Sequence, residues 1–172
     1  PIIGLAQNTA YDVEVTVSVG AVTNVKTATF TTRALPAAAG APNKTITAGS
    51  SATTIQTAFN ALNPGDVIQF QDGTYTVSSL ILNRAGTSGS PIYIRGTTRA
   101  ATILSDTTGR ILQMQAASHI ILENLTMTGS GVDSGTSSSS VGIEFYDATP
   151  NQTRITIRNL TMTGVDRAIG TF

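Results

Sequence analysis

Apolar and polar residues alternate one by one near the start of the chain. From Tyr11 to Val17 every second residue is tyrosine or valine, and acidic or hydroxyl residues stand between them. This two-residue period is typical of a half-buried β-strand. A second strand is predicted over residues 26–32, after a connection at residues 20–24. The two segments therefore predict an antiparallel pair.

The residues around this pair carry a family resemblance. Leu5 precedes Tyr11 across a short polar stretch, and residues 30–36 read Phe-Thr-Thr-Arg-Ala-Leu-Pro. The pattern resembles the tyrosine corner and closing strand of fibronectin type III domains, in which the tyrosine hydroxyl caps a nearby backbone group. The resemblance implies that residues 1–35 are the C-terminal strands of such a sandwich. A coincidental hairpin packed on the following domain is the alternative, since two strands alone cannot bury a sandwich core.

The composition changes after the second strand. Residues 36–43 are small, flanked by proline and without periodicity, as is typical of a linker. Beyond the linker, apolar residues recur at helical spacing from Ile55 to Leu62. This spacing predicts a short amphipathic helix over residues 53–62, with an N-cap at residue 50, 51 or 53.

An internal repeat gives the clearest signal for the rest of the chain. Residues 119–129 and 154–164 match at an offset of 35 residues and share Asn-Leu-Thr-Met-Thr-Gly. A strand-rich unit of this length is too short for a propeller blade and predicts a β-solenoid, in which like residues stack. Asn124 should then lie over Asn159, and we expect both to point inward as a structural ladder of amides. A second stack of strands is predicted at residues 110–114, 141–145 and 167–172.

A second family resemblance covers residues 44–172. The segments at residues 58–75 and 86–96 resemble the opening of pectin lyase-like right-handed parallel β-helices, closest to the alginate lyase and chondroitinase B group. The resemblance implies an all-β fold whose short N-terminal helix caps the first coil. It also implies uronic acid polysaccharides as ligands and, by analogy with the lyases, calcium as a cofactor. The same opening introduces lyases, hydrolases, epimerases, adhesins and phage spikes, so it indicates a fold rather than one activity.

Composition narrows the choice of partners. Only 12% of the residues are charged, and ten basic residues balance ten acidic ones, so no nucleic-acid partner is expected. Membrane insertion is not expected either, because no apolar run approaches the roughly 20 residues that span a bilayer. The chain has no cysteine, which excludes thiolate metal sites and disulfides. Abundant Thr, Ser, Gly and Ala favour a bacterial protein that is secreted or held at the cell surface.

No catalytic residue is recognisable. Elimination on a uronate needs Lys or Arg beside several acids, yet every strong base after Lys44 is an arginine outside any known motif. The best binding cluster is Glu144, Tyr146 and Asp147, because alternation turns Glu144 and Tyr146 outward, where sugar or calcium would bind. An ordinary polar outer face is the alternative interpretation.

Three other polar residues have simpler interpretations. His119 is the sole histidine, and we expect it to face solvent at the start of a strand. Asp66 and Asp72 stand beside glycines and are expected to form turns.

Two functions stay open. The first is an extracellular carbohydrate-active or polysaccharide-binding protein, whose active groove is expected on coils outside this stretch. The second is a structural or adhesive protein, such as a filament subunit that self-associates through open strand edges. Pro1 is not an initiator methionine, so we expect a processed product or part of a longer chain.

Overall fold

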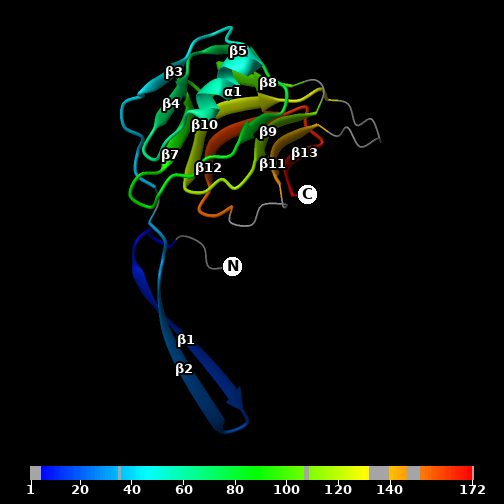
Figure 1. Ribbon diagram of the computed structural model, residues 1–172. Coiled ribbons are helices and arrows are strands. Elements are labelled where there is room, and N and C mark those ends of the chain that lie inside the picture. The colour runs from blue at the N-terminus through cyan, green and yellow to red at the C-terminus, as the bar shows by residue number, and fades with distance from the viewer. Residues whose placement is uncertain (1–4, 35, 107–108, 132–139, 147–151, 172) are drawn as a thin grey trace. The chain divides into compact units, whose positions relative to one another are not determined.

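The computed structural model describes residues 5–34, 36–106, 109–131, 140–146 and 152–171 (Figure 1). The chain divides into two compact units, Pro1–Ala38 and Ala39–Phe172, and the division falls within the predicted linker. The described residues form thirteen strands and one α-helix, which is an all-β architecture. None of them forms a helix long and apolar enough to cross a membrane.

The first unit is a hairpin of two antiparallel strands, β1 (Ala10–Val19) and β2 (Val22–Thr31). The reversal takes two residues, so the predicted connection at residues 20–24 was too long. Gly20 makes the tight turn feasible, because its φ of 61° lies in the left-handed region that glycine enters without steric cost. The Tyr11 hydroxyl accepts a hydrogen bond from the Ala6 backbone N–H at 2.7 Å, as the tyrosine-corner pattern predicts.

The larger sheet of the second unit has seven strands within the described residues. They are β3 (Lys44–Ile46), β4 (Val67–Phe70), β5 (Gly73–Thr76), β7 (Ile92–Gly96), β8 (Thr102–Ser105), β10 (Ile120–Thr128) and β12 (Thr156–Thr163). Strand β10 is central: one edge pairs first with β7 and then with β8, and its other edge pairs with β12. All pairings in this sheet are parallel. Two runs, β3–β4–β7–β10–β12 and β5–β8–β10–β12, each follow chain order and meet at β10.

The repeat predicted the register between β10 and β12. Leu122 lies opposite Ile157, Leu125 opposite Leu160, and Met127 opposite Met162, as the 35-residue offset requires. A second parallel sheet confirms the predicted second stack of strands. Its members are β6 (Leu80–Leu82), β9 (Arg110–Met114), β11 (Val141–Phe145) and β13 (Arg167–Thr171), paired in that order.

The two sheets of this unit enclose one apolar core. Leucine, isoleucine and methionine side chains from both sheets are almost fully buried in it, among them Leu80, Leu104, Leu112, Leu122, Met127 and Ile143. Near one end of the stack, Phe70 makes edge-to-face contacts with Phe59 and Tyr75, at ring-centroid distances of 6.3 and 5.2 Å. Such pairs add about 0.5–1.5 kcal/mol to the burial of the rings.

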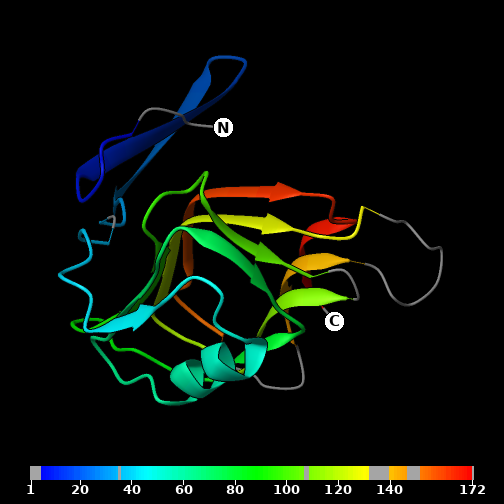
Figure 2. The same ribbon diagram turned by 90° about the horizontal axis from the view of Figure 1, so that it is seen from above.

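Helix α1 (Ala52–Asn60) lies at that end of the stack, opposite β12 (Figure 2). The Ser51 hydroxyl caps the helix by accepting a hydrogen bond from the Thr54 N–H at 3.2 Å. The helix ends two residues before the predicted Leu62, because the N–H groups of Ala61 and Leu62 bond three residues back, to the Ala58 and Phe59 oxygens, in a tightened last turn. Ile55 and Phe59 point into the core, so the helix covers apolar side chains of the first strands.

One polar residue of α1 contacts an edge strand directly. The Gln56 side chain donates to the Ile81 backbone oxygen and accepts from the Ile81 N–H, both at 2.8 Å. Ile81 is in β6, the last strand of the four-stranded sheet on that side. The amide of Gln56 therefore makes the hydrogen bonds that another strand would otherwise make.

The two repeated asparagines occupy bends within β10 and β12. Asn124 and Asn159 have φ values of 57° and 50°, and the Asn159 Nδ2 donates to the Asn124 Oδ1 at 2.5 Å. This hydrogen bond is the amide-to-amide contact that the predicted ladder requires, but Asn159 is exposed and Asn124 only partly buried, so the expected inward orientation was wrong. Left-handed backbone, which asparagine tolerates well, places these residues at a corner rather than on the inner face of a straight strand.

Candidate functional site

Polar side chains gather on the outer face of the four-stranded sheet. The strand register aligns Ile81 with Gln113 and Gln113 with Glu144. These positions alternate with Leu112 and Ile143, which belong to the core. Successive side chains of a strand point to opposite faces, so Gln113 and Glu144 point away from the core.

Glu144 lies on this outer face, as alternation predicted, but its side chain is fully buried rather than exposed to a ligand. Its Oε1 lies 2.7 Å from the Arg110 Nε, and its Oε2 accepts a short hydrogen bond from the Gln113 Nε2. The Gln115 Nε2 in turn donates to the Gln113 Oε1 at 2.5 Å. A buried carboxylate requires such donors and an opposite charge. Glu144 therefore orients Arg110, whose side chain is 44% exposed.

Tyr146 lies just beyond the end of β11 and is 39% exposed. Its N–H donates to the Met114 backbone oxygen at 3.1 Å, and its own oxygen accepts from the Gln152 Nε2 at 2.5 Å. Glu144 and Tyr146 are two residues apart, so alternation gives their side chains the same side of the sheet. Asp147, the third member of the predicted cluster, lies outside the described residues.

A second polar column on the seven-stranded sheet was not recognised from the sequence. The register places Gln69, Arg95, Glu123 and Arg158 on four successive strands. The Arg95 Nε donates to the Gln69 Oε1 at 2.9 Å, and both the Nε and Nη2 of Arg158 lie 2.6 Å from the Glu123 Oε2. The signal was present in the repeat, because Glu123 and Arg158 are 35 residues apart.

Asp66 lies in a turn before β4, as expected, and its carboxylate contacts that turn and the chain around the start of β3. Its carboxylate accepts from the Asn43 side chain at 2.7 Å and from the Asn63 N–H at 2.8 Å, and it lies 3.3 Å from the Lys44 ammonium. Burial alone would raise the pKa of Asp66. The hydrogen bonds from Asn63 and Asn43, together with Lys44, outweigh burial and lower the pKa below its ordinary value of 3.8.

Asp72 and His119 also make local contacts. The Asp72 Oδ1 accepts from the backbone and hydroxyl of Thr98 at 3.1 and 2.9 Å, and from the Thr102 hydroxyl at 3.1 Å. His119 immediately precedes β10 as expected, but it is partly buried rather than fully solvent-facing. Its Nδ1 lies 3.4 Å from the Ser118 hydroxyl. These contacts are structural ties between neighbouring segments.

Calcium, which the family resemblance implies, does not fit the donors around Glu144. Calcium takes about six to eight oxygen ligands, whereas the Glu144 Oε2 accepts a hydrogen bond from Gln113 and the Oε1 lies in an ion pair with the Arg110 guanidinium. Over the described ranges, no group of three or more His, Asp or Glu side chains is arranged to hold a metal ion.

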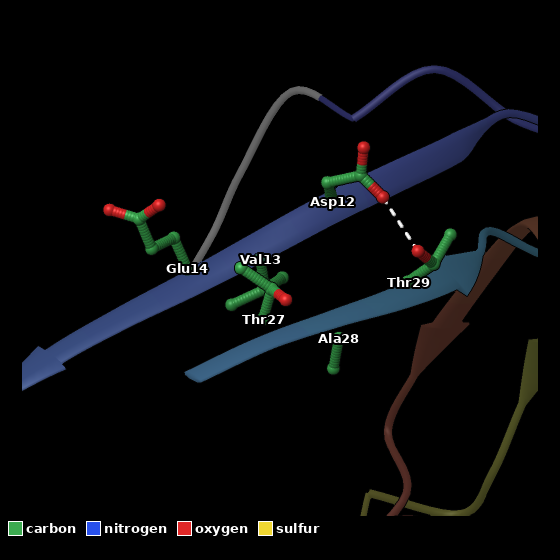
Figure 3. Close-up of a pocket in the computed structure, with 6 residues that line it drawn as sticks. All are labelled: Asp12, Val13, Glu14, Thr27, Ala28 and Thr29. Carbon is green, nitrogen blue, oxygen red and sulfur yellow. Dashed lines mark hydrogen bonds between the residues drawn. The ribbon is translucent and has the colours of Figure 1, made fainter. Parts of the chain in front are cut away.

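A shallow depression lies on the hairpin of the first unit (Figure 3). It is lined by Asp12, Val13, Glu14, Thr27, Ala28 and Thr29. The Thr29 hydroxyl donates to the Asp12 Oδ1 at 2.6 Å, and the Glu14 carboxylate points away from that pair. The polar groups do not converge on one point, so the depression offers a ligand little more than a flat sheet surface.

Comparison with known proteins gives one structural neighbour to report. No family model matches the chain, and no curated protein matches it. An alginate lyase from Paenibacillus sp. str. FPU-7 superposes with a TM-score of 0.46 and 23% sequence identity, over 68% of this chain and 44% of the lyase chain. The chain thus spans less than half the length of that lyase. A likeness at this level carries no argument about the fold or the activity of this chain.

Proposed function

We propose that residues 44–172 are coils of a right-handed parallel β-helix in an extracellular protein that binds uronic acid polysaccharides. Three features support the β-helix: parallel stacking in chain order, a step of 35 residues between β10 and β12, and left-handed asparagines at corresponding corners. A right-handed connection between parallel strands is the strong preference of polypeptide chains. The helix α1 then caps the first coil.

The Arg110–Glu144 pair is the observation that carries the ligand class. Guanidinium groups recognise carboxylates through paired hydrogen bonds. The Arg110 side chain is 44% exposed, and its ion pair with the buried Glu144 carboxylate orients it. Tyr146 offers an exposed aromatic ring farther along the same face, suited to the apolar face of a sugar ring.

Binding rather than cleavage is the role proposed for this face. The acid at the site is buried and paired, so it is poorly placed to abstract a sugar proton. We therefore expect the chain to bind polyuronates without releasing unsaturated uronate. A rise in ultraviolet absorbance on incubation with alginate, chondroitin or pectate would contradict this expectation.

The binding test uses a double variant that leaves no buried charge unpaired. Arg110→Gln with Glu144→Gln neutralises both partners and leaves the net charge unchanged. We expect polyuronate affinity, measured by calorimetry, to fall about ten- to a hundredfold, since one charge-assisted hydrogen bond contributes about 1.5–3 kcal/mol. The matched control is Lys44→Gln with Asp66→Asn, which neutralises the ion pair near the first strands and also leaves the net charge unchanged. Equal binding of neutral dextran and polyuronate by the unaltered protein would refute the proposed function.

A structural, self-associating role is the second candidate, and the hairpin favours it. Five valines of the hairpin are 48–75% exposed, which is an unusual apolar surface for two strands. They are Val15, Val17, Val19, Val22 and Val25. If a second copy covers this surface, light scattering after size exclusion will show a concentration-dependent dimer that Val17→Thr weakens. A monomer at every concentration would exclude this candidate.

A further inference from the structure

The polar column on the seven-stranded sheet is unevenly paired. Arg95 and Glu123 are register partners on adjacent strands, about 4.8 Å apart. Glu123 is only 7% exposed, and its Oε2 is held by both the Nε and Nη2 of Arg158 from the strand beyond. The negative charge of Glu123 is thus neutralised on the side away from Arg95.

Arg95 is held in place by a neutral group. Its Nε donates to the Gln69 Oε1 at 2.9 Å, which fixes the side chain without compensating its charge. Within the described part of the chain, its two terminal nitrogens have no hydrogen bond or ion pair. Two arginines against one glutamate leave the column with one net positive charge, and that charge resides at Arg95.

An apolar strip lies beside this cation. Tyr93 is two positions before Arg95 on β7, is only 6% exposed, and packs with Val67 and Ile121 on the outer face of the sheet. Burial raises the pKa of Tyr93, so its hydroxyl stays neutral. The column therefore presents one oriented guanidinium beside buried apolar side chains, with Glu123 of the adjacent strand already paired with Arg158.

We propose that Arg95 binds one carboxylate of a uronic acid polymer, with Gln69 as its positioning residue, at a second site separate from Arg110. The proposal rests on the proposed function and extends it. Arg95 and Arg110 lie on different sheets, whose outer faces point in different directions around a common core. One protein therefore engages two polymer segments and can cross-link them.

The test counts binding sites for a short ligand. A uronic acid trisaccharide is titrated by calorimetry at low salt, because salt weakens exposed charge interactions. We expect two sites in the unaltered protein and one in Arg95→Gln, while Arg33→Gln, which removes the same charge from the first unit, keeps two. Glu123→Gln removes the neighbouring negative charge and should tighten binding at the Arg95 site about three- to tenfold.

The outcomes separate the two proposals. No binding by the unaltered protein would defeat the proposed function and this inference together. One site that is lost in the Arg110→Gln, Glu144→Gln variant and unaffected by Arg95→Gln would overturn the inference alone. If Arg95→Gln lowers the melting temperature, an unchanged affinity of Glu123→Gln still refutes the role of Arg95.

Discussion

Replacing Gln56 by alanine tests how the first end of the strand stack is closed. The substitution removes two hydrogen bonds to the Ile81 backbone, each 2.8 Å long, and one from the Gln56 Nε2 to the Asn60 Oδ1 at 2.9 Å. Each hydrogen bond contributes about 0.5–1.5 kcal/mol net, and the exposed one to Asn60 belongs at the low end. Ile81 is partly exposed, so water will replace part of what is lost.

Alanine also has the higher helix propensity, by at most about 0.7 kcal/mol, which offsets part of the loss. The free energy of unfolding should therefore fall by about 1–2 kcal/mol. Circular dichroism during urea denaturation of the whole chain measures this change. Because the N–H and C=O groups of β6 become available to another chain, size-exclusion chromatography should also show self-association.

Thr57→Ala is the matched control on the same helix. Its hydroxyl is exposed and donates only within the helix, to the Thr53 backbone oxygen at 2.9 Å. An unfolding free energy for Gln56→Ala within about 0.3 kcal/mol of this control would show that the Gln56 amide does not substitute for a strand.

Three further predictions concern stability. Leu122→Ala, at a fully buried core position, should lower the unfolding free energy by about 2–5 kcal/mol in urea titrations. Asp66 has a lowered folded-state pKa, so its stabilisation is present above pH 3.8 and is lost as the pH falls below it. In Asp66→Asn, the melting temperature should fall less between about pH 4 and lower pH than it does in the unaltered protein. Asn159→Ala should cost about 1 kcal/mol more than Asn159→Gly, because alanine is strained at a φ of 50°; equal melting temperatures would contradict this.

The sequence by itself determined that β10 stacks on β12 and in what register. Two segments 35 residues apart share the same apolar positions, and parallel stacking of identical patterns allows one register that keeps Leu122 and Ile157 on the inner face. The hairpin, the helix and its serine N-cap follow from local periodicity and capping, which involve residues close together in the chain.

Only the tertiary structure decided the surroundings of the polar side chains. Alternation correctly turned Glu144 away from the core but did not predict that Arg110 and Gln113, on a neighbouring strand, leave it no exposure. The contact between Gln56 and Ile81, 25 residues apart, likewise depends on where a helix meets a sheet edge. A one-dimensional pattern states which face a side chain takes. How deeply a polar side chain is buried, and which groups it bonds to, depends on residues far away in the sequence that only the folded chain brings together.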